Sequence, residues 1–102
     1  MKVTERCLKY IEKKKIKKIY VRLIFKKGPC NDNYCKIIPD IVFDKNPFPG
    51  EIYTLYYSLN NLQIFVTKTL ERALSKNRKE IELDVNIFGR FFFRNFEYDK
   101  IY

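Results

Sequence analysis

Hydrophobic and polar residues alternate along much of this chain, and the alternation is most regular in two segments. Segments 19–25 and 80–87 place an apolar residue at every second position. Because successive side chains of a strand point to opposite faces of a sheet, each segment predicts a strand with one buried face. The residues that we expect to be buried are Ile19, Val21, Leu23, Phe25, Ile81, Leu83, Val85 and Ile87.

Shorter apolar runs, separated by turn residues, predict four more strands. Pro39 has no backbone N–H, which indicates an edge strand or a bulge for its segment. Asn60 and Asn61 provide a tight turn between two of the runs, and Gly89 turns the chain back against segment 80–87. Two hairpins are therefore expected. The four additional strands are predicted over 37–43, 51–58, 62–66 and 91–98.

Two helices are predicted in addition to the strands. Thr4 is a suitable N-cap for a helix over 5–15, and Thr67 or Thr69 caps a shorter helix that ends near 75–77. The apolar faces consist of Cys7, Leu8 and Ile11 in the first helix and of Leu70, Ala73 and Leu74 in the second. The pattern predicts a mainly β fold with two helices, of the α+β class.

Length and composition favour one packed domain. The 102 residues suffice for a single core, so we expect one domain over 1–102. Nine phenylalanines and eight tyrosines exclude a disordered chain. Without a signal-peptide core or a long apolar run, we expect a cytoplasmic protein with no membrane partner. Richness in lysine and isoleucine resembles archaeal or thermophile composition, although codon usage produces the same bias.

The excess positive charge is concentrated near the N-terminus. The formal net charge is +9, and residues 1–36 contain twelve Lys or Arg against three acids, whereas later residues contain nine of each. A basic stripe of this kind binds nucleic acid or another acidic partner through counterion release. The alternative is a solvated helix end, where lysines complement the helix dipole. The candidate polyanion-binding residues are Lys13, Lys14, Lys15, Lys17 and Lys18.

Two of the three cysteines lie close together in a chain that has no histidine. Cys30 and Cys35 lie in segment 28–35, between two predicted strands, and lysines that favour the thiolate form flank them. We interpret the pair as candidate metal ligands or redox thiols, and a simple disulfide or apolar packing at strand ends as equal alternatives. Cys7 is expected in the core. The flanking cations are Lys26, Lys27 and Lys36.

Two other groups have simpler explanations than a functional site. An acidic row alternates along segment 80–87, and a solvated face with cross-strand ion pairs is favoured over metal binding or acid–base chemistry. The C-terminal phenylalanines are of the type that stacks on bases, but core packing is favoured in so short a chain. These residues are Glu80, Glu82 and Asp84, and Phe91, Phe92, Phe93 and Phe96.

The order of elements and several short motifs resemble the HesB-like family, which includes the A-type iron-sulfur cluster carriers. Segment 3–11 is similar to the family's opening helix, and 28–30 is similar to its Gly-x-Cys loop. Segments 62–70 and 81–84 resemble the middle of the family pattern, and 88–96 resembles its Gly-Phe-x-Phe-x-Asn-Pro stretch. The resemblance covers nearly the whole chain. It implies a mixed β-sandwich or half-barrel with an N-terminal helix.

The resemblance also implies a cargo and partners. In the family, one loop cysteine and a C-terminal Cys-Gly-Cys meet across a dimer to hold an iron-sulfur cluster or iron. Here Cys30 matches the loop cysteine and Cys35 is an additional thiol, Phe96 replaces the proline, and Tyr102 lies where the C-terminal pair would begin. A homodimer and a protein partner in iron-sulfur or sulfur metabolism are implied. Two thiolates complete a four-ligand site only if two chains contribute.

From the sequence we expect a HesB-like protein that is not an enzyme. Cys30 and Cys35 would bind an iron-sulfur cluster or a thiophilic metal, or change redox state. The alternative is a divergent binding or structural module whose basic N-terminal third contacts an acidic partner or nucleic acid. An enzyme is least supported, because the sequence has no histidine base, nucleophile elbow or phosphate-binding glycine loop.

Overall fold

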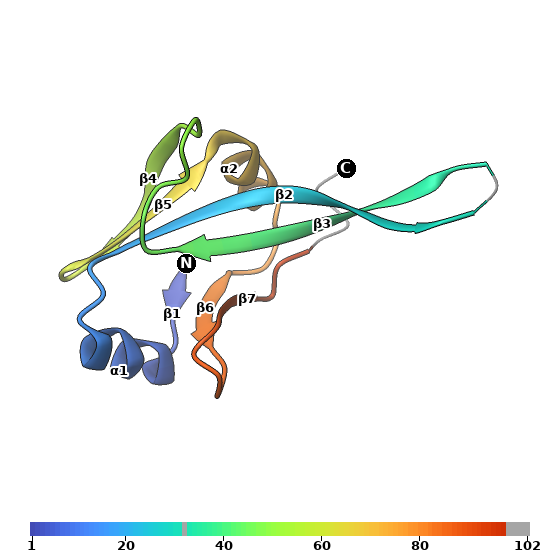
Figure 1. Cartoon of the computed structure of the whole chain (residues 1–102). Coiled ribbons are helices and arrows are strands. Elements are labelled where there is room, and N and C mark those ends of the chain that lie inside the picture. Colours follow the sequence, from blue (N-terminus) through green and yellow to red (C-terminus); the bar gives the residue numbers. More distant parts are fainter. Residues whose placement is uncertain (32, 98–102) are drawn as a thin grey trace.

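A computed structural model describes residues 1–31 and 33–97 of the chain (Figure 1). It confirms the prediction of a mainly β, α+β fold with two helices. In chain order the elements are β1 (Lys2–Val3), α1 (Glu5–Lys14), β2 (Lys18–Cys30), β3 (Cys35–Asp44), β4 (Tyr53–Leu59), β5 (Leu62–Thr67), α2 (Lys68–Ser75), β6 (Glu82–Val85) and β7 (Phe91–Arg94).

The strands form two mixed sheets. One sheet has the order β1-β6-β7, in which β6 is parallel to β1 and antiparallel to β7. The other has the order β3-β2-β5-β4, in which β2 and β5 are parallel and the remaining neighbours are antiparallel. Both predicted hairpins, β4–β5 and β6–β7, are confirmed. Strand β3 lies at a sheet edge, as Pro39 indicated.

The N-terminal helix begins and ends at residues suited to those positions. Thr4 has an extended backbone, and its Oγ1 accepts a hydrogen bond from the N–H of Cys7 at 3.2 Å, which confirms Thr4 as the N-cap. Lys15 adopts a left-handed conformation (φ 56°) that ends the helix. Cys7 and Ile11 are buried on its inner face. Helix α2 follows Thr67, whose side chain makes no capping hydrogen bond.

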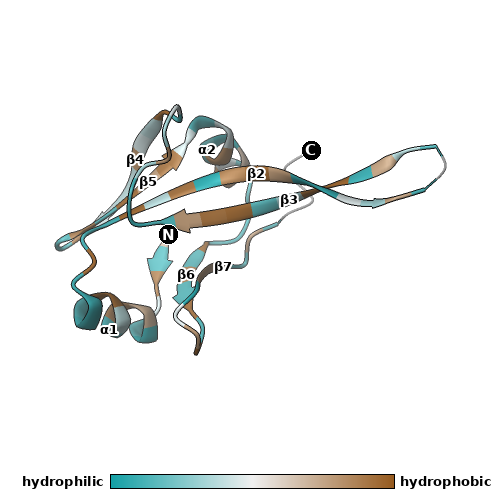
Figure 2. Cartoon of the chain, viewed as in Figure 1, coloured by the Kyte–Doolittle hydropathy of each residue, from teal (hydrophilic) through white to brown (hydrophobic). Residues whose placement is uncertain are grey.

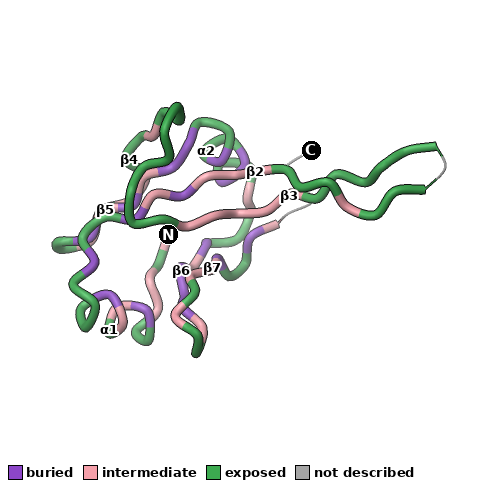
Figure 3. Tube along the Cα trace, viewed as in Figure 1, coloured by how far each residue is buried: buried purple, intermediate pink, exposed green. Residues whose placement is uncertain are grey.

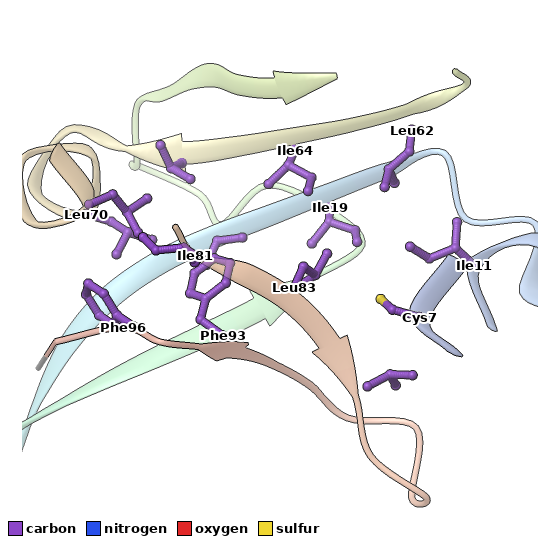
Figure 4. Close-up of a cluster of buried hydrophobic side chains, with 14 of the residues drawn as sticks. Cys7, Ile11, Ile19, Leu62, Ile64, Leu70, Ile81, Leu83, Phe93 and Phe96 are labelled. Carbon is purple, nitrogen blue, oxygen red and sulfur yellow. The ribbon is translucent and has the colours of Figure 1, made fainter. Parts of the chain in front are cut away.

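One cluster of buried apolar side chains lies between the two sheets and extends to both helices (Figure 4). Strands β2, β5 and β6 contribute alternate residues to it, as the sequence pattern predicted. Phe93 and Phe96 are buried in the same cluster, so core packing is confirmed for these two phenylalanines. Its residues include Cys7, Ile11, Ile19, Val21, Leu62, Ile64, Val66, Leu70, Ile81, Leu83, Val85, Phe93 and Phe96.

Two of the eight residues that we expected in the core are exposed instead. Phe25 is 50% exposed and Ile87 is 87% exposed, and Leu23 is only partly buried. Both segments do form strands, but the described elements that pack over each strand cover a shorter stretch than the alternating residues. Strand β6 ends at Val85, so Ile87 lies in the following turn. Strand β2 extends beyond the other described elements at this point, so Phe25 stays half exposed.

The last predicted strand is also shorter than expected. Strand β7 ends at Arg94, where Asn95 takes a left-handed backbone (φ 64°). Phe96 is buried outside any strand. Tyr98, the predicted end of the strand, lies outside the described residues.

Strands β2 and β3 form a hairpin whose outer end extends beyond the body of the molecule (Figures 1 and 3). The principal dimensions of 49 × 29 × 27 Å reflect this extension. We call its described residues, 25–31 and 33–38, the arm. The segment 28–35, predicted as a loop, is shorter in the structure, because β2 reaches Cys30 and β3 begins at Cys35.

Candidate functional site

The hairpin brings Cys30 and Cys35 together at the outer end of the arm. The two residues are direct partners across the β2–β3 ladder and form a disulfide, with Cα atoms 4.0 Å apart. The ladder continues from Tyr20 to Lys27 and then shifts register before Cys30. The proximity of these two thiols, predicted from the sequence, is confirmed. The disulfide was one of the alternatives left open, and it is the state that the structure shows.

The turn between the cysteines is stabilised by a side chain of the turn itself. Asn31 Oδ1 accepts hydrogen bonds from the N–H groups of Asn33 and Tyr34 at 3.0 and 3.1 Å. The backbone N–H of Asn31 also donates to the carbonyl oxygen of Tyr34 at 2.9 Å. Asparagine is frequent in turns because its short side chain makes such local hydrogen bonds. The turn therefore holds the ends of the two strands in a position where their cysteines pair.

Gly28 allows the two strands of the arm to pack closely beside the disulfide. A Cβ at this position would lie 2.7 Å from Cδ1 of Ile38 and 3.1 Å from the carbonyl oxygen of Lys36. The Sγ atom of Cys30 lies 3.7 Å from the carbonyl oxygen of Gly28. A larger residue would push β3 away from β2 immediately before the cysteine pair, so glycine maintains the spacing of the site.

The surroundings of the disulfide are exposed and basic. Cys30 and Cys35 are both exposed, as are the three lysines near them. Lys26 Nζ forms an ion pair with Asp40 Oδ2 at 2.7 Å, which directs one of the three charges to a carboxylate farther along β3. Lys27 and Lys36 form no ion pair with a described residue. After reduction, nearby positive charge favours the thiolate form of a cysteine.

The donor atoms of one chain do not fit a metal ion or an iron-sulfur cluster as a complete site. Residues 1–31 and 33–97 contain no group of three or more Cys, Asp or Glu side chains that could hold a metal. Cys30 and Cys35 supply two sulfur atoms, and these are bonded to each other. Because a tetrahedral sulfur site needs four ligands, one chain provides half of such a site at most.

Cys7 lies apart from this pair. It lies on the inner face of α1 and is fully buried in the core, as predicted (Figure 4). Burial, with a smaller contribution from the charge of Asp84, raises the pKa of the Cys7 thiol to about 12. A thiol with such a pKa stays protonated near neutral pH, so Cys7 is unreactive and serves as a control for experiments on the arm.

Asp84 forms a buried polar cluster that the sequence analysis missed. We expected the acidic row to be solvated, and that expectation is wrong for Asp84, which is only 1% exposed. Its carboxylate accepts hydrogen bonds from Thr4 Oγ1 at 2.7 Å, Arg6 Nη2 at 2.6 Å and Arg94 Nε at 2.6 Å. The backbone N–H of Val85 donates to it as well. The expected cross-strand ion pairs are present, but they cover the carboxylate.

The pKa of Asp84 follows from these contacts. Burial alone raises the pKa of a carboxyl group, but hydrogen bonds from Arg6, Thr4, the Val85 N–H and Arg94 together hold it well below its usual range. Asp84 is therefore ionised and fully engaged, with no oxygen free for a metal or for proton transfer. The sequence does place this acid between two apolar residues, Leu83 and Val85. The arginines that bind it are too distant in the chain for the contact to be predicted.

The five lysines of the predicted basic stripe are all exposed. Lys13 and Lys14 end α1, Lys15 follows it, and Lys17 and Lys18 lead into β2. None of them forms an ion pair with a described residue. The stripe and the cysteine pair lie at opposite ends of β2, so they belong to separate surfaces (Figure 1).

Comparisons with known proteins add no family to this description. Neither a family model, a curated protein nor a solved structure matches the chain. Neither α1 nor α2, the helices of the described residues, has the length and hydrophobicity of a membrane-spanning helix.

Proposed function

We propose that Cys30 and Cys35 form a reversible dithiol–disulfide couple, and that the chain is a non-enzymatic protein that exchanges this disulfide with thiol partners. The observation that supports the proposal is the position of the bridge, exposed at the end of an arm and apart from the core (Figure 3). Exposed disulfides are the labile and regulatory ones, whereas buried structural disulfides resist reduction.

A purely stabilising role is a weaker explanation of this bridge. The cysteines are only five positions apart, so the bridge closes a short loop in the unfolded chain. The chain-entropy model gives about 2 kcal/mol for such a loop, at the low end for disulfides. Neither cysteine belongs to the buried cluster or to the residues that pack against it. Reduction is therefore expected to leave the fold in place.

The exchange needs a reductant, which we propose to be a dithiol. One thiolate of the dithiol attacks a sulfur of the Cys30–Cys35 bridge, which forms a mixed disulfide and releases the other cysteine as a thiolate. The second thiol of the reductant then attacks the mixed disulfide and releases the first cysteine. Two electrons and two protons pass to Cys30 and Cys35, and the dithiol leaves as a disulfide.

The proposal is tested by equilibrating the protein in glutathione buffers of graded redox potential and counting free thiols by alkylation and mass spectrometry. We expect two thiols to appear together, with a midpoint above about −300 mV, the upper limit typical of structural disulfides. The Cys7→Ser variant should give the same midpoint, since its thiol is buried and separate. The Cys30→Ser variant should show no two-electron transition.

Two results would contradict the redox proposal. A midpoint below that limit would make the bridge a structural disulfide. The second result would be that protein purified without oxygen carries stoichiometric metal or sulfide, which the Cys30→Ser variant loses and the Cys7→Ser variant keeps. In that case Cys30 and Cys35 would be metal ligands, as the resemblance to the HesB-like family implied, with two chains needed to complete the site.

A second candidate function is supported by the exposed lysines at the end of α1. All five lysines are solvent-accessible and carry charge that no described carboxylate neutralises. We propose that they contact a polyanion such as nucleic acid. Lysines that bind phosphate groups release the cations condensed on the nucleic acid, and this release favours binding. This role is independent of the cysteines, because it uses the opposite end of β2.

A further inference from the structure

The arm carries an apolar stripe on the same face of the sheet that forms the core. In the β2–β3 ladder, Phe25 is paired with Pro39 and Lys27 with Ile37, and cross-strand partners share a face of the sheet. Two-residue alternation places this face in line with the buried Val21. We call Phe25, Lys27, Ile37 and Pro39 the arm stripe.

Burial along this face falls steeply where β2 leaves the body of the molecule. Val21 is 0% exposed, Phe25 is 50% exposed and Ile37 is 57% exposed. Figures 2 and 3 show hydrophobic residues on an arm that is mostly exposed. The apolar positions of β2 therefore continue to Phe25, beyond the part of this face that a described element covers. A pattern that predicts burial where the fold leaves exposure is expected at sites that serve a function.

The charge around the stripe indicates what kind of partner fits it. Residues 25–38 contain three lysines and a single acid, Asp32. Lys27 belongs to the stripe itself and has no described ion-pair partner. A second copy of this chain is poorly suited, because its net charge of +9 and its own Lys27 would be brought against like charges. An acidic surface with an apolar strip is complementary.

We propose that the arm stripe is the docking surface for the protein dithiol that exchanges with Cys30–Cys35. The partner would present an apolar strip bordered by carboxylates beside its reactive thiols. Phe25 and Ile37 would provide apolar contact, and Lys27 and Lys36 would steer the encounter. This inference rests on the proposed redox function, but it goes further, because it makes exchange with a protein faster than the chemistry of the bridge alone would allow.

The test compares one protein dithiol with one small dithiol. The second-order rate constant for reduction of Cys30–Cys35 is measured with reduced thioredoxin and, separately, with dithiothreitol. We expect a Phe25→Ser, Ile37→Ser double variant to react about tenfold more slowly with thioredoxin, a loss typical of one buried apolar contact. With dithiothreitol its rate should be unchanged, because a small dithiol needs no docking surface.

A matched control is available elsewhere on the molecule. Leu55 on β4 is 51% exposed, close to the exposure of Phe25, and lies in a different strand of the same sheet. Leu55→Ser should leave both rate constants unchanged. Lys27→Glu keeps the apolar side chains. Because the lost charge also acts on the leaving thiolate, we expect it to slow reduction by both reductants, but reduction by thioredoxin more than reduction by dithiothreitol and with a weaker dependence on salt. Lys27→Glu therefore tests the stripe even if the double variant does not fold.

Three outcomes would overturn the inference, and a fourth would overturn the proposed function instead. Equal slowing with both reductants would mean that the substitutions alter the bridge itself. No slowing with thioredoxin would remove the docking role. Self-association of the wild type that the double variant abolishes, in sedimentation experiments, would make a second copy the occupant. If dithiothreitol fails to reduce the folded wild type, the redox proposal fails first.

Discussion

At the scale of single residues, Asp84 shows how one buried carboxylate joins distant parts of the chain. Thr4 caps α1 and also donates to Asp84, and Arg6 in the first turn of that helix donates to the same group. Arg94 reaches it from β7. The helix and the three-stranded sheet are thus joined through one charge. Removal of the charge leaves two cations without their partner, which is costly near a buried site.

The Asp84 cluster predicts a stability that depends on pH. The pKa of Asp84 is lowered in the folded state, so its ionisation stabilises the fold above the unfolded pKa of about 3.9. That contribution is lost as the pH falls toward the folded pKa. We expect Asp84→Asn to lower the free energy of unfolding by about 1–3 kcal/mol at neutral pH, and by progressively less in acid. Urea unfolding at several pH values measures this.

Glu80→Gln is the control for that experiment. Glu80 forms ion pairs with Lys2 Nζ at 3.7 Å and with the N-terminal amino group at 3.9 Å, and its side chain is 53% exposed. Exposed ion pairs contribute little, so this variant should unfold like the wild type at each pH. A difference between wild type and Asp84→Asn that stays constant down to strongly acidic pH would refute an electrostatic role for Asp84.

At the scale of elements, the turn between β6 and β7 shows how a helix and a hairpin fit together. Asn86 Oδ1 accepts hydrogen bonds from the N–H groups of Phe88 and Arg90 at 2.9 and 3.0 Å. Gly89 has a left-handed backbone (φ 76°). A Cβ on Gly89 would lie 2.7 Å from the hydroxyl oxygen of Tyr10 on α1. Glycine is thus required both for the turn and for the approach of the helix.

Gly89→Ala and Gly50→Ala separate these two requirements. Gly50 has a similar φ of 86°, but a Cβ there would meet nothing within 4 Å. We expect Gly50→Ala to cost about 1–2 kcal/mol of stability, from the backbone alone. Gly89→Ala should cost more, and adding Tyr10→Phe should recover part of the excess. Denaturant unfolding of the two glycine variants and of the Gly89→Ala, Tyr10→Phe double variant gives the comparison. Equal losses for both glycines would exclude the contact with Tyr10.

At the scale of the whole molecule, the two candidate functions occupy opposite ends of the long strand β2. The arm extends the molecule to 49 Å and carries the cysteine pair away from the core. The exposed lysines at the other end of β2 lie in the last turn of α1, in the residues that connect it to β2 and at the start of β2. Because the two surfaces are separate, substitutions at one should leave the other function intact, and each proposal can fail without the other.

The lysine proposal predicts binding that depends strongly on salt. Five phosphate contacts would weaken binding of duplex DNA by about 10²–10³-fold between 50 and 200 mM salt. Fluorescence anisotropy with a labelled duplex measures this. A variant with Lys13, Lys14, Lys17 and Lys18 all replaced by Gln should lose most of the salt dependence. The matched control replaces four other lysines, Lys45, Lys68, Lys76 and Lys79, by Gln, and it should keep the salt dependence. Binding that does not change with salt concentration would rule out a phosphate contact.

Local patterns in the sequence determined most of the elements of this protein. Thr4, the alternation in β2, β5 and β6, and the turn at Asn60 and Asn61 act over a few residues, so their effects are readable along the chain. The pairing of Cys30 with Cys35 belongs to this group, because four intervening residues between two strands of one hairpin bring them together.

Which parts of those patterns are covered depends on packing between elements that are distant in the chain. Phe25 and Ile87 continue the alternation of their neighbours, yet burial depends on whether another element packs over them, and that is not encoded in the period of a strand. Asp84 needs Thr4, 80 positions away in the chain, before its burial is tolerable. The residue pattern of each strand therefore specifies which face turns inward, whereas long-range packing specifies where that face ends and which charged groups meet there.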